Sequence, residues 1–255
     1  MADPLRNPLK TRLAHGKTCI GAWLTSGSSI YAEAMASLGF DWLCIDLEHG
    51  STDISQVEAV FQAVERHGVS AMARIASLDG DLARRLLDLG AAGIIVAAVE
   101  DAGAFESFAR FCRYAPDGHR GVGLSRCNKW GDEFDHYKQD FLPVLVPMIE
   151  TRRGVDAAQN LAALAIVDAL FLGPYDLSSD LGCIGDFEAP DFIAAVDTVR
   201  QACAGKAFGF HQVKPDMDEL RTRIAEGFTL LAYGTDVIAM RHALGGVRQI
   251  GENGK

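Results

Sequence analysis

The stretch LCIDLEHG, residues 43–50, runs from an apolar segment directly into two carboxylates and an imidazole. A buried strand more commonly ends in neutral turn residues. Asp46, Glu48 and His49 are instead residue types that move protons or hold cations. Their position predicts that the end of this strand faces a reactive site, so the question becomes which other side chains reach the same place.

Short apolar runs alternate with segments of helical period along the whole chain. The predicted strands are residues 19–24, 41–46, 70–75, 92–98, 142–150, 167–173, 207–213 and 229–236. The predicted helices are residues 28–38, 53–66, 79–89, 101–112, 151–163, 189–203, 215–226 and 236–244. Eight such units without a break in composition predict an α/β protein that folds as a single (β/α)8 TIM barrel over residues 1–255. A doubly wound sheet is the alternative, but it would not naturally use eight units of this regularity.

In a barrel of this kind the carboxyl ends of all strands meet at one mouth, where the active site is built. Ordinary loop residues occupy the opposite ends of the predicted strands. At the carboxyl ends the chain concentrates aromatic and ionisable side chains, which are Trp23, Asp46, Glu48, His49, Arg74, Glu100, Glu150, Asp176, His211 and Asp236.

Glu150 and Asp176 follow neighbouring predicted strands. Hard divalent cations such as Mg²⁺ or Mn²⁺ take oxygen ligands, often one or two carboxylates completed by water and substrate oxygens. An acid at a strand end can equally cap the helix that follows. The pair therefore indicates a metal site, with helix capping as the structural alternative.

Arg74 and His49 each allow a functional and a structural interpretation. A guanidinium at a strand end can bind an anionic ligand in two-pronged fashion, or it can pair with a carboxylate of the fold. His49 can act as a general base, ligate a metal or pack in a loop, and Asp46 or Asp88 would tune it if either lies within hydrogen-bonding reach. His211 can line the pocket without taking part in the chemistry.

The lysines argue against an enzyme that works through a Schiff base, because such an enzyme needs a lysine projecting into the mouth. No lysine ends a predicted strand; Lys206 precedes one, at the opposite end of the barrel. Lys129 and Lys138 belong to a long connection, residues 113–141, which is expected to be an active-site loop or a subunit contact. A metal-dependent mechanism is therefore favoured over one that works through a Schiff base.

Composition excludes other classes of function. The formal net charge of −10 and scattered basic residues argue against nucleic-acid binding. No apolar segment is long enough to predict a membrane span, and the amino-terminal residues do not resemble a signal peptide. The six cysteines are widely spaced without a CxxC pair, which favours a reduced, cytoplasmic protein rather than a zinc cluster or disulfide framework.

Several segments in order along the chain resemble the HpcH/HpaI family of metal-dependent class II pyruvate aldolases. They are GFDWLCIDLEHG, the MARI strand with Arg74, RLLDLGAAGIIVAAV with Asp88, RYAPDGHRGVG, IETRRGV with Glu150, and LFLGPYDLSSDLG with Asp176. The resemblance implies a TIM barrel whose last helix is swapped between subunits, commonly in a hexamer built as a trimer of dimers.

The same resemblance implies roles for individual residues. Glu150 and Asp176 would hold a divalent cation, Mg²⁺ or Mn²⁺, with Co²⁺ or Zn²⁺ as alternatives. Arg74 would contact the keto oxygen of a 2-oxo acid, and His49, supported by Asp46 and Asp88, would handle the proton. The substrate-binding candidates are Trp23, Arg74, Gly173, Pro174, Tyr175, Ser125 and His211.

The implied reaction is the reversible addition of pyruvate or hydroxypyruvate to an aldehyde, which gives a 4-hydroxy-2-oxo acid. One departure is visible: many members carry Gln two residues before the metal-binding glutamate, whereas this chain has Met148. Two alternatives remain open. The enolate can condense with an acceptor that is not an aldehyde, as in a citrate-synthase-like biosynthetic enzyme, or the protein can bind a 2-oxo acid without catalysis.

Overall fold

The computed structural model describes residues 7–247, so the outer limits of the predicted domain, residues 1–6 and 248–255, lie outside the described part. Eight parallel strands close into a barrel in sequence order, with the last strand pairing with the first. The predicted TIM barrel is therefore confirmed. The strands are β1 (Cys19–Leu24), β2 (Trp42–Asp46), β3 (Ser70–Ile75), β4 (Gly93–Val96), β5 (Val144–Ile149), β6 (Ala169–Leu172), β7 (Ala207–Gln212) and β8 (Leu230–Thr235).

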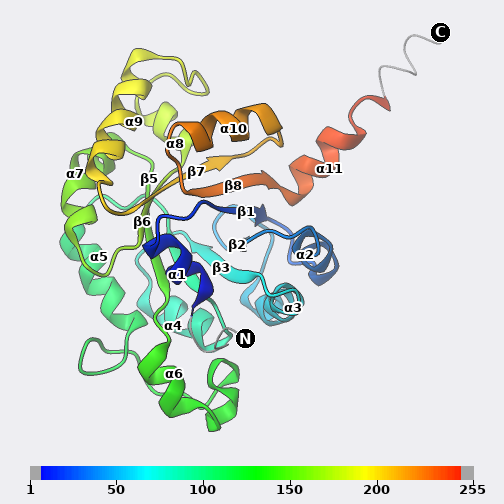
Figure 1. Ribbon diagram of the computed structural model, residues 1–255, viewed down its shortest axis with the longest axis vertical. Helices are drawn as coiled ribbons and strands as arrows, with labels where there is room; N and C mark the ends of the chain where they lie inside the picture. Colours follow the sequence, from blue (N-terminus) through cyan, green and yellow to red (C-terminus); the bar gives the residue numbers. More distant parts are fainter. Residues whose placement is uncertain (1–6, 248–255) are drawn as a thin grey trace.

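Helices surround the strands, with α2 and α3 on the opposite side of the barrel from α5, α7 and α9 (Figure 1). All eight predicted helices are present with slightly different ends. They are α2 (Ser29–Ala36), α3 (Ile54–Glu65), α4 (Gly80–Asp88), α5 (Ala102–Ala109) continued by the short η1 (Arg110–Cys112), α7 (Arg152–Ala163), α9 (Pro190–Ala202), α10 (Met217–Ala225) and α11 (Asp236–Leu244).

Alternation along each strand divides the core into two layers, because successive side chains point to opposite faces of a sheet. The barrel interior is filled by large side chains such as Trp23, Trp42 and Phe171, whose rings contact one another edge to face or tilted. The layer between strands and helices is formed mainly by aliphatic and phenylalanine side chains that make one continuous cluster. A filled interior leaves no room for a ligand inside the barrel itself.

Three helices that the sequence did not predict add to the basic fold. Helix α1 (Pro8–Ala14) packs at the amino-terminal end of the barrel, where the Lys10 ammonium lies 2.6 Å from the Asp168 carboxylate. Helix α8 (Pro174–Asp180) follows β6 directly, with its proline at the first helical position. Helix α6 (Phe134–Asp140) lies with the 3₁₀ segment η2 (Arg126–Gly131) in the long connection 113–141, which we call the arm.

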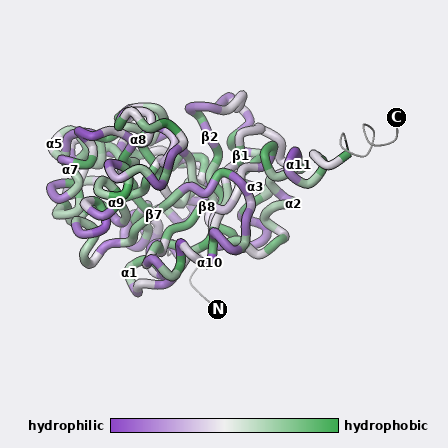
Figure 2. Tube along the Cα trace, turned by 90° about the horizontal axis from the view of Figure 1, so that it is seen from above, coloured by the Kyte–Doolittle hydropathy of each residue, from purple (hydrophilic) through white to green (hydrophobic). Residues whose placement is uncertain are grey.

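Helix α11 begins against the barrel beside β8, and its far end projects away from the rest of the fold (Figure 1 and Figure 2). Among its residues only Asp236, the first, is buried, while Val237, Met240 and Leu244 are exposed apolar side chains. Its first residue is therefore its main anchor to the barrel. Within residues 7–247 no helix combines the length and the apolar character that crossing a membrane requires.

Candidate active site

A pocket of about 250 Å³ opens over the carboxyl ends of the strands. It brings together residues from the carboxyl ends of seven strands, all except β4, as the barrel topology predicts. The lining residues are Trp23, Thr25, Asp46, His49, Arg74, Met148, Gly173, Pro174, Tyr175, Asp176, His211, Val213, Thr235 and Ile238. Most of the candidate residues derived from the sequence therefore share one cavity.

Arg74 and Asp46 form a buried, two-pronged ion pair at the floor of this pocket. They face each other across the β2–β3 pairing, and Arg74 Nε donates to Asp46 Oδ1 over 2.9 Å while its Nη2 donates to Oδ2. Nη1 lies 3.2 Å from Glu48 Oε2. Burial raises the pKa of Asp46, but the hydrogen bonds and charge of Arg74, together with the amides of Glu48 and His49, outweigh it and bring that pKa below its ordinary value. The guanidinium is thus fixed in position and charged.

Glu150 follows β5, and its buried carboxylate accepts a hydrogen bond from the Ala98 amide over 2.7 Å through Oε2. Burial raises its pKa to about 7, and repulsion from Asp176 and Glu48 adds to the shift. The backbone approaches closely here, because a Cβ on Gly173 would lie 2.7 Å from Glu150 Cγ. Glycine at this position therefore leaves room for the glutamate.

The residues present fit a hard divalent cation. Glu150 and Asp176 repel each other when both are ionised, and a cation between them would remove that repulsion. Oxygen donors also match the preference of Mg²⁺ and Mn²⁺. No cluster of three or more His, Cys, Asp or Glu side chains able to hold a metal occurs in residues 7–247, so the remaining ligands would be substrate or water oxygens.

His49 is exposed at the rim of the pocket, on the loop that follows β2. Its backbone amide donates to Asp46 Oδ1 over 3.2 Å, and the Glu48 amide donates to the same atom over 3.0 Å. Within the part of the chain that the structure describes, the imidazole itself has no hydrogen bond to Asp46 or Asp88. Asp46 therefore supports the His49 loop through the backbone rather than through the ring.

Asp88 and Ser125 do not line this pocket. Asp88 ends α4, five residues before the first residue of β4, so it lies near the amino-terminal end of the barrel. Its carboxylate pairs with the buried Arg120 guanidinium of the arm over 2.8 Å. Ser125 also belongs to the arm, where its amide donates to Asn128 Oδ1 over 3.1 Å. Within one chain these two candidates are separated from His49.

His211 stacks on Trp23 with ring centroids 4.5 Å apart, and the Arg74 guanidinium lies 5.4 Å from the centre of the same indole. The His211 Nε2 atom lies 3.4 Å from the Thr235 hydroxyl. Burial lowers the pKa of His211 to about 3, and the positive charge of Arg74 lowers it further than burial alone. The imidazole is therefore neutral near pH 7.

Apart from Met148, which the sequence marked only as a departure from the family pattern, four lining residues were not among the sequence-derived candidates: Thr25, Val213, Thr235 and Ile238. Each lies at or within three residues of the carboxyl end of β1, β7 or β8. Glu48 belonged to the motif that opened the sequence argument, but its contact with Arg74 was not expected. Taking every residue just after a strand as a candidate would have found most of this group.

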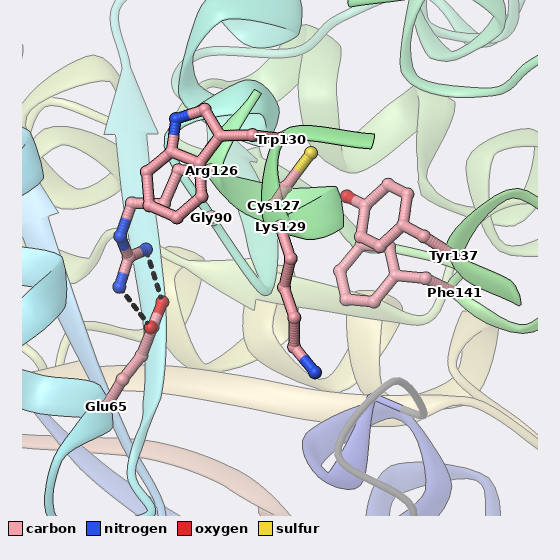
Figure 3. Close-up of a pocket in the computed structure, with 8 residues that line it drawn as sticks. All are labelled: Glu65, Gly90, Arg126, Cys127, Lys129, Trp130, Tyr137 and Phe141. Atoms are coloured by element: carbon pink, nitrogen blue, oxygen red, sulfur yellow. Dashed lines mark hydrogen bonds and ion pairs between the residues drawn. The ribbon is translucent and has the colours of Figure 1, made fainter. Parts of the chain in front are cut away.

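A larger cavity of about 360 Å³ lies beside the arm, lined by the residues labelled in Figure 3. Its charged groups are already paired, because Arg126 Nη2 lies 2.5 Å from Glu65 Oε2 and the Lys129 ammonium lies 3.2 Å from Glu133. The rings of Tyr137 and Phe141 stack against each other at 4.6 Å. This cavity contains none of the candidate residues at the strand ends, so the mouth of the barrel is the better candidate for the active site.

Comparisons with known proteins place the whole barrel in one family. A sequence profile of the HpcH/HpaI aldolase/citrate lyase family matches residues 19–243. The chain is 35% identical over 243 residues to a hydroxypyruvate/pyruvate aldolase of Chromohalobacter salexigens, which covers 93% of this chain and 94% of that protein. It is 35% identical over 246 residues to a 2-keto-3-deoxy-L-rhamnonate aldolase of Shigella sonnei, with 94% and 91% covered.

Among solved structures, an HpcH/HpaI aldolase/citrate lyase family protein from Burkholderia cenocepacia has a TM-score of 0.87 and 33% sequence identity. The match covers 95% of this chain and 99% of that one. The similarity thus extends over the barrel and includes every strand end that lines the pocket.

Proposed function

The chain belongs to the HpcH/HpaI aldolase/citrate lyase family and is a carbon–carbon lyase, and from this premise we propose that it catalyses a metal-dependent, reversible aldol reaction. The donor is a 2-oxo acid, pyruvate or hydroxypyruvate, and the acceptor is an aldehyde. The observation that carries the proposal is the convergence of the fixed Arg74 guanidinium with Asp176 and His49 in one pocket. The Glu150 carboxylate lies directly behind this pocket, against Gly173, and is close enough to Asp176 for the two charges to repel.

Glu150 and Asp176 would hold a divalent cation, Mg²⁺ or Mn²⁺, with Co²⁺ or Zn²⁺ as alternatives. When bound there, the cation supplies a Lewis acid that polarises the oxygens of the 2-oxo acid. The Arg74 guanidinium would face the keto oxygen, on which negative charge develops as the carbon acid loses its proton. A donor that Asp46 and Glu48 already hold in place stabilises that charge without reorganising.

His49 is the proposed base. Its imidazole takes a proton from C3 of the donor, and the C3 carbon of the resulting enolate forms a bond to the aldehyde carbon. The aldehyde oxygen takes up a proton and becomes the 4-hydroxyl group. Cleavage is the same path reversed.

The donor pocket departs from many family members at Met148, which is buried beside Gly173. His211 and Thr235 add polar groups to the lining of the same pocket. The name of the Chromohalobacter relative includes both pyruvate and hydroxypyruvate. We therefore propose that both are donors, to be compared directly by the rate at which C3 protons exchange.

Asp88 would support the His49 imidazole only from a neighbouring subunit, because within one chain it lies at the other end of the barrel. The exposed apolar side chains Val122, Leu124 and Trp130 of the arm favour a contact between subunits. We propose a homo-oligomer of the hexameric kind, with α11 swapped between partners. A cytoplasmic location is proposed from the six free cysteines, none of which forms a disulfide.

The test is exchange of the C3 protons of pyruvate in D₂O, followed by proton NMR after treatment with EDTA and again with added Mg²⁺. Exchange that needs the metal is expected for the wild type, whereas Glu150→Ala and Asp176→Ala should show none while remaining folded. The matched control is Glu58→Ala, because Glu58 is exposed on α3 away from the pocket. Full exchange by metal-free Glu150→Ala contradicts the proposal.

A further inference from the structure

The buried carboxylate of Asp236 holds the loop that follows β1. Its Oδ1 accepts from the Thr25 amide over 3.1 Å and from the Thr25 hydroxyl over 2.8 Å. Its Oδ2 accepts from the Ser26 amide over 3.1 Å and from the Ser26 hydroxyl over 2.6 Å. One side chain at the start of α11 thus fixes both backbone and side-chain groups of a segment more than 200 residues away in the sequence.

These contacts differ from an ordinary helix cap. A capping carboxylate accepts from amides in the first turn of its own helix. Asp216 does so at the start of α10, where it accepts from the amides of Asp218 and Glu219. Asp236 is bonded within its own helix only to the adjacent Val237 amide, and the other four bonds cross to β1. Its main structural effect is therefore on the β1 loop.

The β1 loop in turn contacts the loop that carries His49. The Thr25 carbonyl accepts from the Ser51 amide over 3.2 Å. Gly50 lies against the same carbonyl, because a Cβ there would be 2.8 Å from Thr25 O and 2.6 Å from Asp46 O. The two loops therefore meet backbone to backbone, with no side chain between them to absorb a displacement.

We propose that Asp236 is a positioning residue that holds His49 in its reactive place through Thr25 and the Gly50–Ser51 backbone. The proposal deepens the function proposed above and rests on it for the role of His49. Ile238, in the same first turn of α11, lines the pocket, so the base of this helix shapes the site on two sides. The reaction itself does not require Asp236 to touch the substrate.

The test compares Asp236→Asn with Asp216→Asn in the assembled, metal-loaded protein. Asparagine at 236 cannot accept from the Ser26 amide with its nitrogen, so that anchor is lost. We expect kcat for C3 proton exchange to fall about tenfold or more, with a much smaller change in KM for pyruvate, because misplacement of a base slows chemistry rather than binding. Asp216→Asn should lose stability without losing kcat.

Two further measurements separate this proposal from the proposed function. Hydrogen–deuterium exchange of the backbone at residues 47–52 should accelerate in Asp236→Asn and stay unchanged in Asp216→Asn, whether or not pyruvate is the substrate. Ser26→Ala should lower kcat alone but add little in the Asp236→Asn background, since both act through one contact. If hydrogen–deuterium exchange of the backbone at residues 47–52 is unchanged in Asp236→Asn, or if kcat equals that of Asp216→Asn, the positioning role is overturned. A wild-type protein that does not exchange the C3 protons of pyruvate overturns the proposed donor instead.

Discussion

Arg74 and Asp46 lie side by side on β3 and β2 and are joined by two hydrogen bonds, with both side chains no more than 5% exposed. A guanidinium held in this way keeps one edge fixed by the fold and turns Nη1 towards Glu48 and the pocket. The ion pair contributes both to the stability of the barrel and to the placement of a positive charge at its mouth. Substituting one partner should therefore change both stability and activity.

Asp46→Asn should damage both properties. Removing one partner of a buried ion pair leaves an uncompensated charge and costs about 3–5 kcal/mol of unfolding free energy. We also expect kcat to fall about a hundredfold or more, because Arg74 would no longer be held towards the developing charge. Denaturant unfolding and exchange of pyruvate protons measure the two effects. Asp168→Asn is the matched control: it breaks the Lys10 pair at the far end of the barrel, so it should lower stability and leave kcat unchanged.

Gly173→Ala should weaken metal binding. The new methyl group would overlap the Glu150 side chain and approach Met148 Cε within 2.9 Å, so the glutamate must move. We expect a Kd for Mn²⁺ raised about tenfold or more, since displacing a ligand by even a fraction of an ångström degrades the site. Titration calorimetry measures this directly. Gly103→Ala on α5 has room for its methyl group, and a similar loss of affinity there would exclude the steric explanation.

His211 should make the protein sensitive to mild acid. Burial lowers its pKa from 6.5 to about 3, so between these values the unfolded chain binds a proton that the folded chain does not. The contribution of the neutral His211 imidazole to the free energy of unfolding is complete above pH 6.5 and is lost as pH falls towards 3. Between pH 7 and pH 5 the wild type should lose about 2 kcal/mol more than His211→Asn. Urea unfolding across this range measures the difference, which should be constant above pH 7; parallel curves throughout would contradict it.

Mixing inactive subunits tests whether Asp88 acts across an interface. His49→Ala and Asp88→Ala should each be nearly inactive in proton exchange. If the site combines His49 of one subunit with Asp88 of another, random co-assembly restores about one quarter of the sites. The measurement compares the rate of proton exchange by the co-expressed variants with the rates of the two separately purified variants at equal protein concentration. Recovery absent from hetero-oligomers verified by mass spectrometry would place Asp88 outside the site.

The sequence by itself determined the barrel and the identity of most residues at its mouth. Apolar residues recur with one period in strands and another in helices, because the two structures point their side chains differently. The pattern of apolar residues along the chain therefore predicts the order of strands and helices. The strand ends then follow from topology, which is why Asp46, Arg74 and His211 line one pocket and Glu150 lies against Gly173 of its wall. The family resemblance was confirmed by a family profile that matches residues 19–243 and therefore spans all eight strands.

Only the tertiary structure decided which charges meet. Sequence spacing left Asp46 as a partner for His49, whereas the β2–β3 register placed it against Arg74. It also left Asp88 free to reach His49, but α4 returns towards the start of β4 and leaves Asp88 beside Arg120. The contact between Asp236 and the β1 loop joins the two ends of the chain, because closure of the barrel makes β8 the neighbour of β1. Strand register and barrel closure are long-range properties, and no local pattern of residues carries them.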